Sequence, residues 1–127
     1  MKQKNILLIE DNEQNRYLAT FLLGQHGFKV VSVPDGQAGI ETARKLLPDL
    51  ILLDIQLPMM DGYAVARAMR DIPLLCNIPI VAVTSYAMVG DREKCLAAGC
   101  NGYIEKPINP ETFVAEIGKF FNLPPAT

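Results

Sequence analysis

Five short strand-like runs, most of them aliphatic, alternate with five amphipathic segments along this chain of 127 residues, and no other feature constrains the fold as strongly. Near-continuous aliphatic strands between amphipathic helices indicate a parallel sheet that is covered on both faces. We therefore predict an α/β fold with a doubly wound, five-stranded parallel sheet and five helices. The expected strands cover residues 5–10, 28–33, 50–54, 78–85 and 102–106, and the expected helices cover residues 12–27, 34–49, 61–72, 89–100 and 109–121.

The sequence gives a start signal for the last helix and an apolar face for the first helix. Asn109 is a suitable N-cap and Pro110 suits the first helical position, so we expect the last helix to begin there. The buried stripe of this helix is expected to contain Phe113, Ile117 and Phe120 or Phe121. One face of the first helix carries Tyr17, Leu18, Phe21 and Leu22.

The overall composition excludes several classes of protein. The formal net charge is −2, so electrostatics do not mark a nucleic-acid binder. No apolar run approaches the length of a membrane span, and the N-terminus lacks the small-residue cleavage site of a signal peptide. The three cysteines form no CxxC pair, which favours reduced thiols in a cytoplasmic protein. We expect neither nucleic acid nor membrane among its partners.

Polar side chains end four of the expected strands or come directly after them. Ligand sites of doubly wound sheets lie beyond the carboxyl ends of the strands. Carboxylates, hydroxyls and an ammonium group should therefore meet at one edge of the sheet. The residues concerned are Glu10, Asp11, Asp54, Thr84, Ser85 and Lys106.

This set of side chains suits phosphoryl transfer assisted by a metal ion. Clustered carboxylates repel one another, so a cation must hold them together. Oxygen ligands alone suit a hard divalent ion such as Mg²⁺. A carboxylate such as Asp54 can also act as a nucleophile and form an aspartyl-phosphate. The metal and Lys106 would neutralise charge on the transferred group, and the Thr84 hydroxyl would donate to one of its oxygens.

Four separated segments resemble the signature segments of response-regulator receiver domains. They read LLIEDN, LILLDIQLPMMDG, VAVTSYA and YIEKP, and they occur in the family's order and at matching spacing over nearly the whole chain. The resemblance implies the flavodoxin-like strand order 2-1-3-4-5, with the five helices on both faces of the sheet. The tail after the last expected helix, NLPPAT, is too short to form a DNA-binding module, so we expect a single receiver domain over residues 1–127 with no effector domain.

The resemblance assigns roles to the acidic residues at this edge. Asp54 corresponds to the phospho-acceptor. Asp11 corresponds to the direct metal ligand. Glu10, where many relatives have aspartate, corresponds to the acid that acts on the metal largely through water. The backbone carbonyl of Gln56 is expected to complete the Mg²⁺ site.

Three further residues correspond to the part of the family that responds to phosphorylation. Thr84 and Lys106 would bind the phosphoryl oxygens. Tyr103 matches the aromatic residue whose side chain changes orientation on activation. Lys106 and Pro107 match a peptide bond that is cis in the family. We expect phosphorylation to draw Thr84 and Lys106 inward and to change the surface formed by the fourth helix, the fifth strand and the fifth helix.

The expected function is a phosphorylation-activated switch of a two-component phosphorelay rather than an enzyme, apart from self-phosphorylation by small donors and self-dephosphorylation. The physiological donor would be a histidine kinase or a histidine phosphotransfer protein. The changed surface would contact a downstream protein, with the receiver as a monomer or as a weak dimer formed on phosphorylation. We expect a complete single-domain regulator, and the alternative is a receiver module cut from a hybrid kinase.

Two other functions remain open. A Mg²⁺-dependent phosphohydrolase that forms an aspartyl-phosphate usually needs a second acid two residues after the nucleophile, and here that position is Gln56, which cannot serve. An interaction module that has lost phosphorylation is disfavoured by the full set of acceptor, acids, lysine and threonine. In a receiver, Gln56 and Tyr86 would flank the path of water to the acyl phosphate and slow its hydrolysis.

Overall fold

One parallel sheet lies at the centre of the computed structural model, which describes residues 3–85 and 90–122 of the chain. The order of the strands is β2-β1-β3-β4-β5, and all adjacent pairs are parallel. The predicted doubly wound α/β fold and its strand order are thereby confirmed. The strands are β1 (Asn5–Ile9), β2 (Lys29–Val33), β3 (Leu50–Asp54), β4 (Ile80–Thr84) and β5 (Gly102–Glu105).

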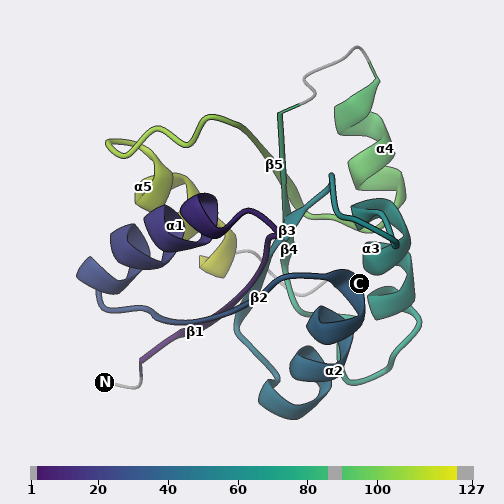
Figure 1. Ribbon diagram of the computed structural model, residues 1–127. Coiled ribbons are helices and arrows are strands. Elements are labelled where there is room, and N and C mark those ends of the chain that lie inside the picture. The colour runs from purple at the N-terminus through teal and green to yellow at the C-terminus, as the bar shows by residue number, and fades with distance from the viewer. Residues whose placement is uncertain (1–2, 86–89, 123–127) are drawn as a thin grey trace.

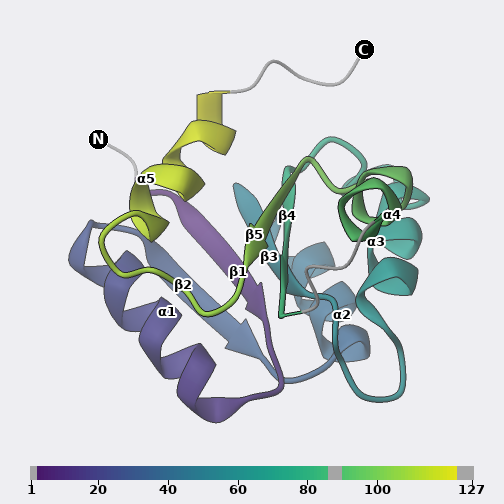
Figure 2. The same ribbon diagram turned by 90° about the horizontal axis from the view of Figure 1, so that it is seen from above.

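The helices cover the two faces of this sheet in separate groups. They are α1 (Glu13–Gln25), α2 (Gly36–Leu46), α3 (Gly62–Arg70), α4 (Asp91–Ala97) and α5 (Phe113–Gly118), and a short 3₁₀ helix, η1 (Lys119–Asn122), follows α5. Helices α1 and α5 lie on one face, whereas α2, α3 and α4 lie on the other (Figures 1 and 2). The described part of the chain contains no helix that is long and apolar enough to cross a membrane.

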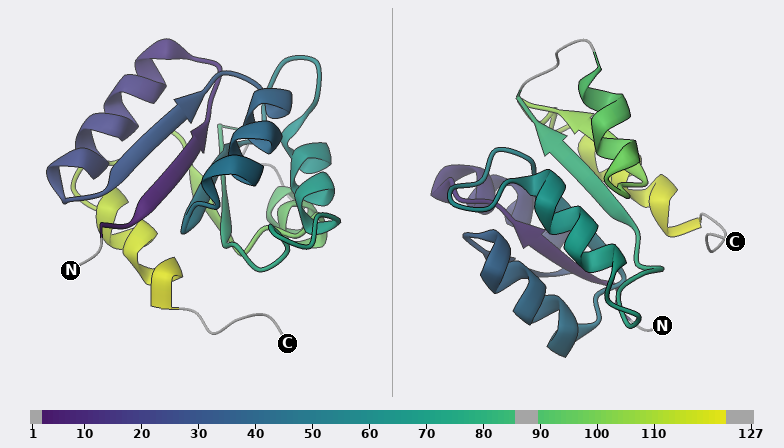
Figure 3. Two further views of the ribbon diagram at one scale, coloured as in Figure 1. Left: turned by 90° about the horizontal axis from the view of Figure 1, so that it is seen from below. Right: turned by 90° about the vertical axis from the view of Figure 1, so that its right-hand side faces the viewer.

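The three inner strands, β1, β3 and β4, are aliphatic at nearly every position because both faces of the sheet are covered. Successive side chains of a strand point to opposite faces. In β1, Ile6 and Leu8 belong to the core that includes α1 and α5, whereas Leu7 and Ile9 belong to the core that includes α2 and α3. Since the strands are parallel, their carboxyl ends share one edge of the sheet, as the arrowheads of β1 and β2 show in Figure 3.

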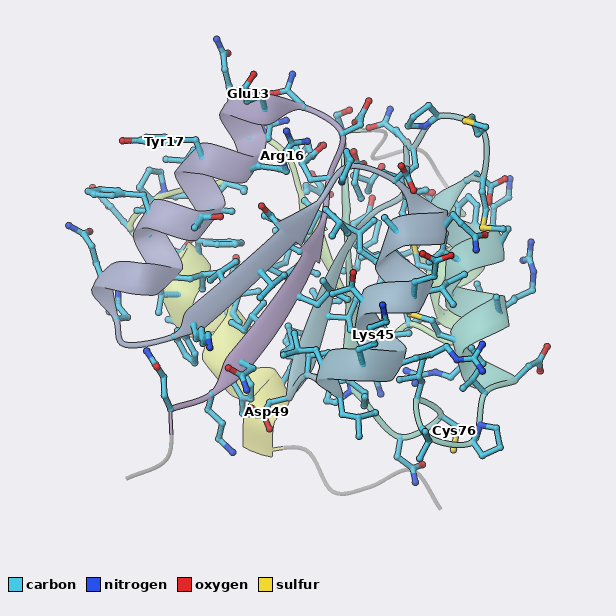
Figure 4. The ribbon with its side chains drawn as sticks, turned by 60° about the horizontal axis from the view of Figure 1, so that its bottom comes forward. Glu13, Arg16, Tyr17, Lys45, Asp49 and Cys76 are labelled. Atoms are coloured by element: carbon cyan, nitrogen blue, oxygen red, sulfur yellow. The ribbon has the colours of Figure 1, made fainter. Side chains whose placement is uncertain are left out.

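The face of α1 that contacts the sheet is not the face with the aromatic residues. Ala19 and Leu23, four residues apart, are buried against the sheet, and Leu22 is partly buried. Tyr17 and Phe21 share a face, as predicted, but they are 75% and 50% exposed and their rings stack on each other. Figure 4 shows Tyr17 pointing away from the sheet.

Helix α5 begins at Phe113 rather than at Pro110, so the predicted start was wrong. The Asn109 side chain accepts a hydrogen bond from the Glu111 backbone N–H at 3.0 Å, and the Asn109 carbonyl accepts from the Phe113 N–H at 2.9 Å. Asn109 therefore makes the hydrogen bonds of an N-cap, as predicted, but the turn that it caps precedes the regular helix. Phe113 and Ile117 are buried, as predicted.

Candidate functional site

Three carboxylates lie together at the carboxyl ends of β1 and β3. One oxygen from each of Glu10, Asp11 and Asp54 lies within 4.8 Å of the other two. Glu10 and Asp54 are buried, whereas Asp11 is exposed. The pairing of the strands produces this arrangement, because Ile9 is the partner of Leu53 and the following residues, Glu10 and Asp54, are therefore neighbours.

Lys106 brings a cation to these acids from the end of β5. Its ammonium nitrogen lies 2.7 Å from Glu10 Oε1 and 3.4 Å from Asp54 Oδ2. Its backbone N–H donates to the Thr84 carbonyl at 2.8 Å, which holds the loop after β5 against the end of β4. The Lys106–Pro107 peptide bond is cis, as the resemblance implied. The structure thus brings the predicted lysine to the acidic cluster.

Burial and charge together set the protonation of this group. Burial, followed by the hydrogen bond with Asp54, raises the pKa of Glu10 to about 7, although Lys106 acts in the opposite direction. Burial alone would lower the pKa of Lys106, but the hydrogen bond with Glu10 and the charge of Asp54 outweigh it, so the net pKa is raised. Glu10 and Lys106 therefore hold their protons more tightly in the folded protein than in water.

Arg16 holds the loop between β1 and α1, and the sequence did not identify it as a site residue. Its guanidinium donates to the backbone carbonyl of Glu10 at 2.8 Å and to that of Asp11 at 3.2 Å. Figure 4 shows Arg16 on the side of α1 that faces the strand ends. The available signal was a basic residue at the end of the first turn of a helix that follows two acids. Arg16 fixes the backbone that carries both acids.

The loop after β3 folds back over Asp54. The Gln56 N–H donates to Asp54 Oδ1 at 2.9 Å. The Gln56 side-chain oxygen accepts from the Ser85 N–H at 3.1 Å and from the Ser85 hydroxyl at 2.5 Å, so this side chain crosses from the end of β3 to the end of β4. The role of the Gln56 backbone carbonyl stays a prediction. Tyr86 lies outside the described residues.

The two predicted switch residues lie on β4 and β5, beyond the strand that carries Asp54. Thr84 is the last residue of β4 and is fully buried. Tyr103 is partly buried, and its hydroxyl donates to Asp91 Oδ2 at 3.1 Å. Asp91 also accepts a hydrogen bond from the Tyr63 hydroxyl. Asp91 was not predicted, because in the sequence it is only an acid near the start of a helix.

These residues fit a hard divalent cation. The donors in the acidic cluster are all carboxylate oxygens, which suit Mg²⁺ better than the nitrogen and sulfur ligands typical of Zn²⁺ sites. Three carboxylates share one lysine here, so a bound cation would relieve their mutual repulsion. Asp54 offers a carboxylate nucleophile, and the Lys106 ammonium lies close enough to reach a group attached to it.

Comparison with protein families and with curated proteins gives consistent matches. The family described as the response regulator receiver domain matches residues 6–118. The polar-differentiation response regulator DivK of Brucella anthropi is 38% identical over 117 residues, which cover 92% of this chain and 95% of that protein. The sequence is therefore similar to receivers over almost its entire described length.

Solved structures give the same result for the fold. The receiver domain of a sensor histidine kinase from Pseudomonas aeruginosa matches with a TM-score of 0.88 and 34% identity, over 96% of this chain and 100% of that chain. That structure has a magnesium ion coordinated in its active-site cleft. The chemotaxis response regulator CheY4 of Vibrio cholerae matches with a TM-score of 0.89 and 25% identity over 94% of this chain and 99% of that chain.

Proposed function

Since the chain belongs to the response regulator receiver family, we propose that it is a phosphorylation-activated switch in which Asp54 is the phospho-acceptor. The position of Asp54 is the observation that supports this most. It ends the central strand β3, lies beside Glu10 and Asp11, and has its Oδ2 3.4 Å from the Lys106 ammonium nitrogen. Transfer of a phosphoryl group to a carboxylate needs such a nucleophile together with positive charge around the moving group.

The proposed cofactor is Mg²⁺. Asp11 and Asp54 would bind it directly, Glu10 largely through water, and the Gln56 backbone carbonyl from the loop after β3. When bound, the ion supplies charge neutralisation and orients the incoming phosphoryl group. The exposure of Asp11 leaves the acidic cluster open to solvent on one side, which gives a cation access.

The proposed donor is the phosphohistidine of a histidine kinase or of a histidine phosphotransfer protein. A carboxylate oxygen of Asp54 attacks phosphorus, the P–N bond breaks, and the imidazole leaves with the bonding electron pair. Lys106 then binds a phosphoryl oxygen instead of bridging Glu10 and Asp54, and the Thr84 hydroxyl donates to another oxygen. Because the product is a modified protein, the outcome is a change of state rather than catalytic turnover.

The proposed output is a changed contact surface on α4, β5 and α5. Tyr103 of β5 is hydrogen-bonded to Asp91 of α4, so a movement of this tyrosine alters both elements. A downstream protein would recognise the surface, with the receiver as a monomer or as a weak dimer formed after phosphorylation.

We assign residues 1–127 to a single receiver domain in the cytoplasm, a location that the three free cysteines favour.

A small phosphodonor separates this proposal from its alternatives. With acetyl phosphate and Mg²⁺, the protein should gain one phosphoryl group per chain by intact mass and then lose it slowly after the donor is removed. A phosphohydrolase would instead consume many donor molecules per chain. A module that has lost phosphorylation would neither take up nor consume the donor. Either of these two results would refute the proposal.

A further inference from the structure

One carboxylate joins three elements beside the proposed output surface. Asp91 is the first residue of α4 and is buried. Its Oδ1 accepts a hydrogen bond from the Tyr63 hydroxyl of α3, and its Oδ2 accepts one from the Tyr103 hydroxyl of β5 at 3.1 Å. Each oxygen of this carboxylate is therefore bound to a phenol from a different element.

The surroundings strengthen both hydrogen bonds. Hydrogen bonds to an ionised acceptor are roughly twice as strong as those between neutral groups, and a low local dielectric adds to this. Burial, followed by the hydrogen bond with Asp91, raises the pKa of Tyr103 to about 12, and the same causes raise the pKa of Tyr63. A tyrosine hydroxyl of ordinary pKa is already protonated at neutral pH, and these shifts keep both phenols as donors at higher pH as well.

The residue before Tyr63 is packed against the end of the acceptor strand. The Gly62 N–H donates to the Ile55 carbonyl at 2.9 Å. A Cβ atom at Gly62 would lie 2.5 Å from Ile55 Cα and 2.8 Å from the Asp54 carbonyl oxygen, so the two backbones are in direct contact. The start of α3 therefore cannot shift toward this strand without moving the backbone that carries Asp54. The Tyr63 hydroxyl donates to Asp91 and so connects Asp91 to this fixed end of α3.

We propose that Asp91 is the positioning residue that holds Tyr103 in its present orientation, and that Tyr63 ties Asp91 to the end of the acceptor strand. The inference rests on the proposed function, because Tyr103 is the side chain expected to reorient on phosphorylation. To reorient, Tyr103 must give up a hydrogen bond to a buried carboxylate. Weakening that hydrogen bond therefore increases the population of the reoriented state.

Fluorine NMR of protein labelled with 3-fluorotyrosine tests this inference. The chain has four tyrosines, so each resonance is assigned from one Tyr-to-Phe variant. Beryllofluoride with Mg²⁺ serves as the mimic of the phosphoryl group. In Asp91→Asn, we expect the Tyr103 resonance of the metal-free protein to move toward its beryllofluoride position. The midpoint is the beryllofluoride concentration at which half of the Tyr103 resonance has changed position. In Asp91→Asn it should be roughly three- to tenfold lower than in the wild type.

A second variant and a matched control define the outcome. Tyr63→Phe should give a smaller change in the same direction, because it loosens Asp91 and leaves Tyr103 intact. Glu93→Gln removes a charge from the same turn of α4 at an exposed position, and it should change neither the resonance nor the midpoint. Equal midpoints in wild type, Asp91→Asn and Tyr63→Phe would overturn the inference, as would a higher midpoint in either variant. If Asp91→Asn does not fold, the midpoint of Tyr63→Phe tests the inference alone: a value below the wild type supports it, and an equal or higher value overturns it.

Failure of this inference is distinguishable from failure of the proposed function. Labelling by acetyl phosphate should reach the same stoichiometry in Asp91→Asn as in the wild type. A wild-type protein that takes up no phosphoryl group would refute the proposed function. Normal labelling, with a Tyr103 resonance that does not depend on Asp91, would refute only the inference. The metal-free spectra test the role of Asp91 in either case.

Discussion

Glu10 shows how the fold sets the charge of a single residue. Its pKa is raised from 4.5 to about 7, chiefly by burial. Between these two pH values the folded state keeps a proton on Glu10 that the unfolded state has released. The stability contributed by this proton is fully present below pH 4.5 and is lost as the pH rises through about 7. The metal-free protein therefore loses most of this contribution to its stability as the pH rises from 4.5 to about 7.

A pH series with Glu10→Gln tests this effect. As the pH rises from about 5 to about 7.5 in the absence of metal, loss of the proton from Glu10 in the folded state should lower the free energy of unfolding by on the order of 2 kcal/mol. Glu10→Gln is neutral throughout and should lack this part of the pH dependence. Glu13→Gln, at an exposed position of α1, should keep it. Urea denaturation in the presence of a chelator measures these values, and an unchanged slope in Glu10→Gln would contradict the account.

Gln56 is predicted to control how long the phosphoryl group persists. Its side chain spans from the acceptor strand to Ser85, beside the path that we expect water to take. Gln56→Asn is one methylene shorter and cannot keep both hydrogen bonds, so the phosphoryl group should decay about two- to fivefold faster. Gln37→Asn, an exposed change in α2, should decay at the wild-type rate. The measurement is loss of label after donor removal with Mg²⁺ present, and equal rates would reject the prediction.

At the scale of elements, the strands were the most predictable part of the molecule. The three inner strands, β1, β3 and β4, are runs of aliphatic residues because both of their faces are covered, and this pattern is visible without a structure. The buried face of α1 was less predictable. Apolar spacing groups Tyr17 with Phe21, and only the packing shows that Ala19 and Leu23 face the sheet. The start of α5 was misplaced because Asn109 and Pro110 suit a turn as well as a helix start.

The candidate site was predictable where residues follow directly from strand ends. Glu10, Asp54 and Lys106 meet because parallel strands bring their carboxyl ends to one edge. Arg16 and Asp91 were missed for different reasons. Arg16 binds backbone carbonyls, which any residue offers, and Asp91 binds a tyrosine 28 positions away in the sequence. Neither interaction leaves a local pattern in one sequence.

The contact between α3 and the acceptor strand can be tested with two glycines. A Cβ atom at Gly62 would lie 2.5 Å from the Ile55 backbone, so Gly62→Ala should lower the free energy of unfolding by about 1–3 kcal/mol. Gly24→Ala is the matched control in α1, where nothing lies within 4 Å of the added methyl group. It should raise stability by about 0.5–1 kcal/mol. Urea denaturation gives both values, and a Gly62→Ala protein as stable as the wild type would count against the contact.

For the molecule as a whole, folding assembles charges that repel one another unless a cation binds. Mg²⁺ should therefore raise the melting temperature, by about 5 °C or more at a large excess over its dissociation constant. Asp11→Ala should reduce this increase and should make the metal-free protein more stable, because it removes carboxylate repulsion. Asp71→Ala, at an exposed position after α3, should respond to Mg²⁺ like the wild type. A wild-type melt that does not respond to Mg²⁺ would exclude this metal site.

The central claim is that Asp54 accepts the phosphoryl group, and intact-mass spectrometry tests it most directly. Asp54→Asn keeps the shape of the side chain but removes the nucleophile. Asp61→Asn is the control from the same loop, because asparagine replaces aspartate well at the N-cap of α3. With acetyl phosphate and Mg²⁺, the wild type and Asp61→Asn should each gain one phosphoryl group per chain, and Asp54→Asn should gain none. Labelling of folded Asp54→Asn to the wild-type level would contradict the account.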